Sequence, residues 1–272
     1  MKLTGKITIL IILTFLSCPK AQTVAHGVIR KGKFYFYWGW NRAWYSNSDI
    51  NFRGKDYNFN IKNVAAADRQ TSFSIDKYLN PANATIPQYN FRVGYFITDN
   101  YSISFGIDHM KYVVRENQFV KITGHINNTG TVYDRSYSEE NIQLKKGFLL
   151  FEHTNGLNYI NFDVRRIDEV FNFNKVKINV TGGLGAGILL PKTNTTFINY
   201  KRYDEFHLSG YGINGMVGIN ISFFDSFFIQ SEFKGGYINM PDIRTTIAET
   251  DRASQNFFFY QLNVVFGTVF KF

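Results

Sequence analysis

The 272-residue chain has a single cysteine, Cys18, and only five prolines. One thiol excludes a disulfide scaffold and a cysteine-rich metal cluster. Beyond residue 21 the chain has no apolar run near 18 residues, which excludes a transmembrane helix. The excess of one sign of charge over the other is also small. Once Lys2, Lys6 and Lys20 are set aside, 27 basic residues face 21 acidic ones, and this diffuse excess does not indicate nucleic acid as a partner.

The first 21 residues have the composition of an export signal. Lys2 and Lys6 precede the apolar run Ile7–Leu16, and Ala21 supplies a small residue at a cleavage point. We therefore expect residues 1–21 to be a signal peptide and residues 22–272 to form one β-barrel domain. An alternative interpretation takes Phe15 to Cys18 as a lipoprotein box with a lipidated Cys18.

Aromatic residues are abundant, at 18% of the chain, and they recur with a period of two. In the last sixteen residues, Phe258 to Phe266 place apolar side chains on one face, and Gln261 and Asn263 lie on the other. A period of two predicts strands with one apolar and one polar face. Eight segments show it clearly: 34–44, 88–97, 101–111, 159–171, 175–190, 211–223, 227–237 and 257–272.

The connections between these segments alternate in length. Residues 98–100, 171–174 and 224–226 are short turns, whereas residues 46–86, 115–157, 191–206 and 241–256 are long. Short turns at one end and long loops at the other are typical of a transmembrane barrel. A soluble β-sandwich is the alternative, but its strands do not need so many Gln, Glu, Lys and Arg residues opposite the apolar face.

These features, together with the terminal segment Tyr260 to Phe272, make the chain similar to the small outer-membrane β-barrel proteins of Gram-negative bacteria. The resemblance implies an all-β fold: an antiparallel transmembrane β-barrel with short periplasmic turns and long extracellular loops. It also implies contact with outer-membrane lipid and lipopolysaccharide, and with the barrel-assembly machinery through the segment ending at Phe272.

The strong segments predict eight strands. Ten or twelve stay open, because residues 56–64 and 117–124 also alternate, and Asn155-Gly156 is a hairpin signal. An eight-stranded interior is filled by side chains, so its inward charges are expected to pair with each other. Together with Asp108, this predicted polar network contains Arg92, Asp163, Arg165, Lys177, Glu232 and Lys234.

Three of the five histidines fall where strands meet the long loops, among carboxylates and basic residues. Such a rim suits ion pairs and lipopolysaccharide phosphates, and the loose spacing of its ligand types does not predict a metal site. The candidate outer-rim binding residues are Asp108, His109, Lys111, Glu152, His153, Lys192, Arg202, Asp204, Glu205 and His207.

Two short stretches raise a catalytic alternative. Glu152 to Gly156 resembles the Glu-His-x-Ser-Asn-Gly stretch of outer-membrane phospholipase A, which implies His153 as a general base, although no serine stands two residues after it. His207-Leu208-Ser209 is similar to the His-x-Ser of lipid A deacylase barrels. The alternative is a lipid acyl hydrolase using His153, or His207 with Ser209, and calcium.

Neither stretch is a complete motif, so the sequence favours a non-catalytic protein without a cofactor. We expect loops 46–86 and 115–157 to form an extracellular surface with a binding or structural role. The sequence names no ligand for it. A small-solute pore is a third hypothesis, which needs ten or more strands.

Overall fold

The computed structural model describes residues 28–83 and 86–271. The predicted signal peptide and Phe272 lie outside these residues.

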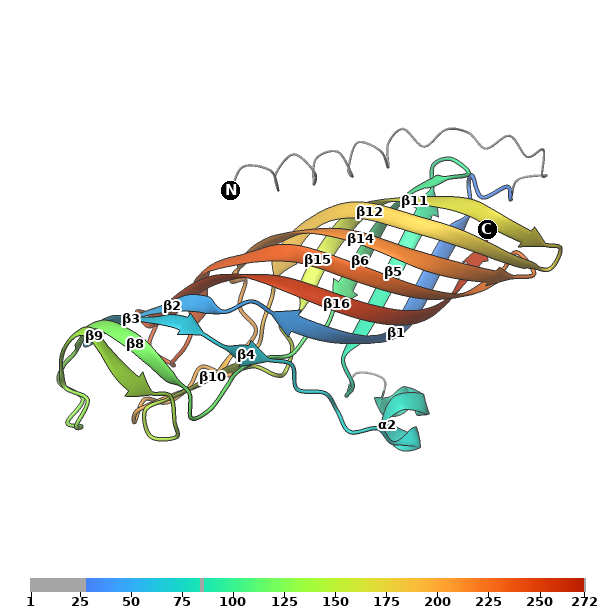
Figure 1. Ribbon diagram of the computed structural model, residues 1–272. Coiled ribbons are helices and arrows are strands. Elements are labelled where there is room, and N and C mark those ends of the chain that lie inside the picture. The colour runs from blue at the N-terminus through green and yellow to red at the C-terminus, as the bar shows by residue number, and fades with distance from the viewer. Residues whose placement is uncertain (1–27, 84–85, 272) are drawn as a thin grey trace.

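Eight strands form a closed antiparallel ring (Figure 1). Pairing of the first with the last, from Phe34↔Phe270 to Tyr45↔Phe259, closes it. The eight-strand prediction is therefore confirmed, and the ten- and twelve-strand alternatives are wrong. In ring order the strands are β1 (Phe34–Tyr45), β5 (Tyr89–Phe96), β6 (Tyr101–Asp108), β11 (Tyr159–Phe173), β12 (Val176–Leu189), β14 (Gly210–Phe223), β15 (Phe227–Arg244) and β16 (Arg252–Phe270).

The start of β1 at Phe34 and the end of β16 at Phe270 lie together at one end of the ring, where the three short turns also lie (Figure 1). The other end carries the long connections. One of these is shorter than expected, because β15 runs on to Arg244 and β16 begins at Arg252. The predicted hairpin at Asn155-Gly156 is wrong: the strand before it pairs with two short strands outside the ring, so no ladder joins it to β11.

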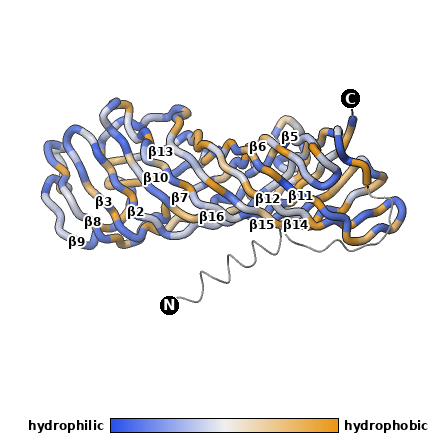
Figure 2. Tube along the Cα trace, turned by 90° about the horizontal axis from the view of Figure 1, so that it is seen from above, coloured by the Kyte–Doolittle hydropathy of each residue, from blue (hydrophilic) through white to orange (hydrophobic). Residues whose placement is uncertain are grey.

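The two faces of the ring strands differ as the alternation predicts, and hydrophilic and hydrophobic residues alternate along the traces in Figure 2. On β16, Phe258, Tyr260 and Leu262 point outward and are about half exposed, whereas Gln261 and Asn263 point inward and are buried. A barrel that is apolar outside and polar inside suits a lipid surround, because every ladder hydrogen bond is satisfied within the ring.

The interior of the ring is filled by paired charges. The Asp163 carboxylate lies 3.0 Å from Arg92 and 2.8 Å from Arg165, and Arg165 also reaches Glu232 at 2.5 Å. Lys234 pairs with Asp108 at 2.6 Å. All six of these residues lie within the ring and are almost fully buried. Lys177 lies apart from this network and pairs with Asp225 at a short turn.

Glycines on β12 make room for these side chains. Gly183, Gly185 and Gly187 face inward, directly opposite Arg165, Asp163 and Asn161 on β11. A Cβ at Gly185 would overlap the Asp163 carboxylate, and one at Gly187 would overlap the backbone of β11. The inward glycines therefore allow large charged groups to pack inside a narrow ring.

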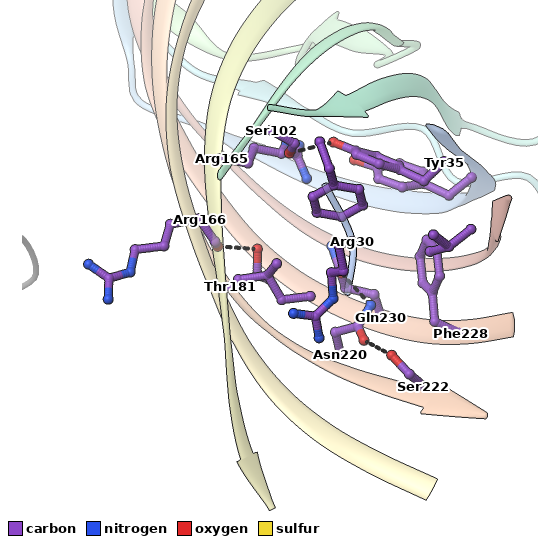
Figure 3. A pocket seen from close by; sticks show the side chains of 14 residues that line it. Arg30, Tyr35, Ser102, Arg165, Arg166, Thr181, Asn220, Ser222, Phe228 and Gln230 are labelled. Atoms are coloured by element: carbon purple, nitrogen blue, oxygen red, sulfur yellow. Dashed lines mark hydrogen bonds between the residues drawn. The ribbon is translucent and has the colours of Figure 1, made fainter. Parts of the chain in front are cut away.

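A small cavity near the short-turn end accompanies this filling, with a volume of about 40 Å³ (Figure 3). Its lining includes Arg30, Tyr35, Arg165 and Phe228. A space of this size holds about one or two water molecules. The interior is thus a packed polar core, which does not suit the pore hypothesis.

Above the ring the long connections fold into two further sheets, which we call the cap. The first continues the upper part of β16 through β2 (Ser48–Arg53), β3 (Tyr57–Val64), β8 (Phe119–Ile126) and β9 (Arg135–Gln143). The second consists of β13 (Asn194–Phe197), β10 (Leu149–His153), β7 (Tyr112–Val114) and β4 (Ala66–Ala67). Figure 1 places the first sheet beyond the end of the ring.

The cap has an apolar core of its own between its sheets. The Phe52 ring lies 5.4 Å from Phe151, and the Tyr57 ring lies 4.7 Å from Phe197. Such rings each stabilise a fold by about 1.5–3 kcal/mol when fully buried. Loops 46–86 and 115–157 are therefore largely a folded layer that closes the barrel above its polar interior.

Helical structure is limited to α2 (Ile75–Leu79) and the 3₁₀ turn η1 (Pro81–Asn83) within the described residues. In the same residues no helix has the length and apolar character to cross a membrane.

Replacing Asp163 by Asn tests whether the interior network holds the barrel together. The change leaves two buried guanidinium groups without their shared carboxylate, so Asp163→Asn is expected to lower the free energy of unfolding by about 3–5 kcal/mol. Urea unfolding in detergent micelles measures this. The matched control is Asp225→Asn, whose partly exposed pair with Lys177 contributes at most about 1 kcal/mol. Equal effects of the two changes would contradict a stabilising role for the network.

Candidate functional site

Three arginines lie side by side on the outer face of the cap. The strand register pairs Arg244 of β15 with Arg252 of β16, and Arg252 with Arg53 of β2. Directly paired residues of an antiparallel sheet point to the same side, about 4.5–5.5 Å apart at Cβ. Their neighbours Ile243, Ala253 and Phe52 point into the cap core and are buried. The arginines therefore form a row facing outward, which we call the arginine row.

Carboxylates neutralise this row only in part. Arg252 donates to Asp242 at 2.6 Å, and Asp242 also contacts His207 at 3.0 Å. Arg244 stacks on the Tyr203 ring at 4.3 Å, and its Nε has no hydrogen-bond partner among the described residues. Within the same residues, neither Arg244 nor the exposed Arg53 forms an ion pair. Because like charges opposite each other are unfavourable in a sheet, an anion placed here would relieve repulsion.

The row continues across the cap sheet as uncharged polar groups. From Arg53 the register leads to Asn58, then to His125 and Ser136. The next row toward the ring runs through Ser254, Asn51, Asn60, Thr123 and Ser138. We call the arginine row and these two rows the polar cap face. Its amides and hydroxyls both donate and accept hydrogen bonds, as sugar hydroxyls require.

The predicted outer-rim residues do not gather at one place. Lys192 and Arg202 both approach Asp204, at 3.7 and 3.1 Å. Glu152 pairs with Arg69 at 2.8 Å, and Glu205 is exposed to solvent. These are separate surface ion pairs, which contribute little stability individually.

Three other rim candidates are held in place by neighbouring loops or strands. The His109 ring stacks on Tyr89 with a centroid distance of 4.9 Å, and its Nδ1 lies 2.8 Å from Asn158. Lys111 donates to Thr71 and to the carbonyl of Ile86. The placement of Asp108 at the rim is wrong, because the side chain points inward to Lys234.

The catalytic alternative receives no support from the geometry. The Ser209 hydroxyl is buried and donates to the backbone carbonyl of His207, whereas the imidazole of His207 contacts Asp242. Among the described residues no hydrogen bond joins that imidazole to a serine hydroxyl. Residues two apart share a face only on a strand, and the chain forms no regular strand at residues 207–209.

His153 lies inside the cap and not on its rim. Its Nδ1 lies 2.9 Å from the Thr193 hydroxyl, and its Nε2 lies 3.2 Å from the Gln255 amide. Burial without a charged partner lowers its pKa from 6.5 to about 3. A fully buried imidazole with both nitrogens contacted does not reach a substrate, so the resemblance to outer-membrane phospholipase A gains no support here.

No group of three or more histidine, cysteine, aspartate or glutamate side chains is arranged to hold a metal ion within residues 28–83 and 86–271. The candidate site is therefore the polar cap face, whose chemistry is that of arginine, amide and hydroxyl groups. Sequence reasoning missed it because its residues belong to strands far apart in the chain.

No family model and no curated protein matches the sequence. Solved structures do show a similar architecture. The outer membrane protein OprG from Pseudomonas aeruginosa is 9% identical, with 90% of this chain and 98% of that chain covered and a TM-score of 0.42. The outer membrane protein AlkL is 12% identical, with 93% and 97% covered and a TM-score of 0.40. Neisserial surface protein A is 11% identical, with 88% and 97% covered and a TM-score of 0.34. The fold that the resemblance implied, an antiparallel β-barrel, is confirmed by the closed ring of eight strands itself.

His153 makes cap stability depend on pH. An unfolded histidine binds a proton near pH 6.5, whereas folded His153 binds one only near pH 3. The contribution of His153 to stability is therefore complete above pH 6.5 and falls as the pH drops toward 3, by about 3 kcal/mol at pH 4.5. His153→Gln is expected to remove most of this loss, measured as the difference in unfolding free energy between pH 7 and pH 4.5. The exposed His125→Gln serves as control, and an unchanged pH dependence in His153→Gln would contradict the assignment.

Proposed function

We propose that this chain is an outer-membrane protein that holds a folded cap outside the cell, and that the polar cap face binds acidic polymers. The membrane location is supported by the apolar outer wall of the eight-strand ring and by its closed hydrogen bonding. In this orientation the three short turns face the periplasm and the cap faces the medium. The outer wall contacts outer-membrane lipid and lipopolysaccharide. The barrel-assembly machinery recognises the segment ending at Phe272.

A binding role fits the ring better than transport does. The interior charges are paired with each other, and the cap core lies above them. A solute would have to displace both cores to pass. The barrel is therefore proposed to act as a rigid support for the cap, which is a non-catalytic role.

The observation that carries the binding proposal is the arginine row. Arg244, Arg252 and Arg53 are held next to each other by the register of three strands, so their repulsion is built into the fold. A sulfate or phosphate group between two guanidinium groups would replace this repulsion with charge-assisted hydrogen bonds. Further along the sheet, Asn58 and Asn60 present amides suited to sugar hydroxyls. Polysaccharides with sulfate or phosphate groups combine both features.

The binding test uses the protein in phosphatidylcholine vesicles, with dextran sulfate as probe and neutral dextran as reference. The double change Arg53→Gln with Arg244→Gln is expected to weaken dextran sulfate binding about tenfold, because it removes about 1.4 kcal/mol of binding free energy. Titration of a fluorescent probe measures the dissociation constant. Salt is expected to weaken the wild-type interaction.

The control is Lys145→Gln with Lys146→Gln, which removes the same charge from another exposed part of the cap and is expected to leave the binding unchanged. Equal weakening by both double changes would show a general charge effect and contradict a site at the arginine row. Adding lipopolysaccharide to the vesicles identifies the source of the anion, since membrane phosphates that occupy the row would compete with dextran sulfate.

A further inference from the structure

One segment of loop 46–86 leaves the cap and returns along the ring. Figure 1 shows α2 next to β1, separate from the two cap sheets. The ring of Tyr78 in α2 lies 5.7 Å from that of Trp40, and Trp40 lies 5.8 Å from Phe266. Phe266 is one of the outward apolar residues of β16. The segment therefore touches the wall that the proposed membrane location assigns to lipid.

The strand pairing of β1 explains why this segment lies against the ring at Trp40. β1 pairs with β5 only from Phe34 to Trp40, because β5 begins at Tyr89. Above this point β1 has β16 on one side only, and the chain on its other side supplies Gln88 and Asp68 as partners for Asn41 and Ala43. Asp68 and Gln88 thus supply hydrogen-bond partners for β1 where a neighbouring strand is missing.

Helix α2 has one apolar and one polar side. Ile75, Tyr78 and Leu79 are spaced at i, i+3 and i+4, which places them on one face of the helix. Lys77 lies opposite this face, and Asp76 on its flank accepts hydrogen bonds from the amides of Asn80 and Asn83 at 2.8 and 2.9 Å. Asp76 is thus hydrogen-bonded within the segment, and on the apolar side the Tyr78 ring contacts Trp40 of the barrel.

The remaining apolar groups are exposed. No residue of α2 is buried; Ile75 is 71% exposed, Leu79 62% and the adjacent Phe73 76%. Apolar area in water costs about 25 cal/mol per Å². Exposing three such side chains on a short segment is therefore unfavourable in water. In lipid the same side chains cost nothing, and they continue the apolar outer wall of the ring.

The segment is fastened in this position. Lys111 donates to the Thr71 hydroxyl at 3.2 Å and to the carbonyl of Ile86 at 3.1 Å, so one side chain ties both ends of the excursion. The Tyr78 hydroxyl donates to the carbonyl of Thr71 at 2.7 Å. Ser74 caps the helix by accepting from the Lys77 amide. These contacts hold the apolar side in a defined orientation against the barrel.

We propose that residues 71–83, the membrane-contact segment, insert Phe73, Ile75 and Leu79 into the outer leaflet beside the barrel. This inference rests on the proposed outer-membrane location. The segment lies in the membrane plane, as amphipathic helices do, with Asp76 and Asn80 toward the headgroups. It widens the lipid contact of the protein on the β1–β5 side, where the ring wall is lowest.

The test measures the environment of single nitroxide labels in lipid vesicles. Cys18→Ser removes the one native cysteine. In this background, Leu79→Cys reports on the segment, Ile103→Cys on the ring wall and Val132→Cys on the cap. Ile103 is 50% and Val132 88% exposed, so all three labels replace exposed apolar side chains. Accessibility to oxygen, which concentrates in lipid, is compared with accessibility to a water-soluble nickel chelate.

The expected result is a Leu79 label that favours oxygen, as the Ile103 label does, about 5–10 Å below the headgroup boundary. The Val132 label should favour the nickel chelate. A Leu79 label that favours nickel while Ile103 favours oxygen would overturn the membrane-contact segment alone. If Ile103 also favours nickel, the membrane location itself fails. Low accessibility of Leu79 to both reagents, with spin–spin broadening, would indicate a second copy as the occupant and would also overturn the proposal.

Discussion

The structure depends on the neutralisation of charge inside a closed eight-strand ring. Asp163 lies between Arg92 and Arg165, Arg165 reaches Glu232, and Lys234 pairs with Asp108. Charges removed from water are tolerated only when they are paired and hydrogen-bonded. Closing the ring gives every strand a hydrogen-bonded neighbour on both sides, and the network gives partners to the charged side chains that closure buries. The inward glycines of β12 are the steric condition for this packing.

The cap reverses the arrangement of the barrel. In the ring, polar residues point inward and apolar residues outward; in the cap, apolar residues point inward and polar residues outward. The longest strand, β16, crosses this boundary. Its inward residues change from Gln261 to Phe259 and Phe257, and its outward residues change from Phe258 to Ser254 and Arg252. At the crossing both faces are apolar, which accounts for four consecutive aromatic residues at 257–260.

The same reversal explains which predictions were confirmed and which were not. Period-two alternation found all eight ring strands, because each strand separates lipid from a polar interior and carries that contrast in its own residues. In the loops, the alternation of residues 56–64 and 117–124 correctly predicted strands, which are β3 and β8. Alternation shows which residues share a face, but it does not show which sheet a strand joins. His153 and His207 were grouped with rim residues by position, whereas burial and hydrogen bonding separate them.

By itself the sequence determined the eight strong strands of the ring, their inward and outward faces, and the charged side chains that fill the interior, whereas the pairing of β1 with β16 decided that the ring closes with eight. These properties depend on local periodicity and on composition, since each strand meets the same two environments. Only the tertiary structure decided that Arg53, Arg244 and Arg252 form one row and that Tyr78 rests on Trp40. Those contacts arise from register between strands distant in the chain, and register is determined by the packing of the whole cap and not by any segment alone.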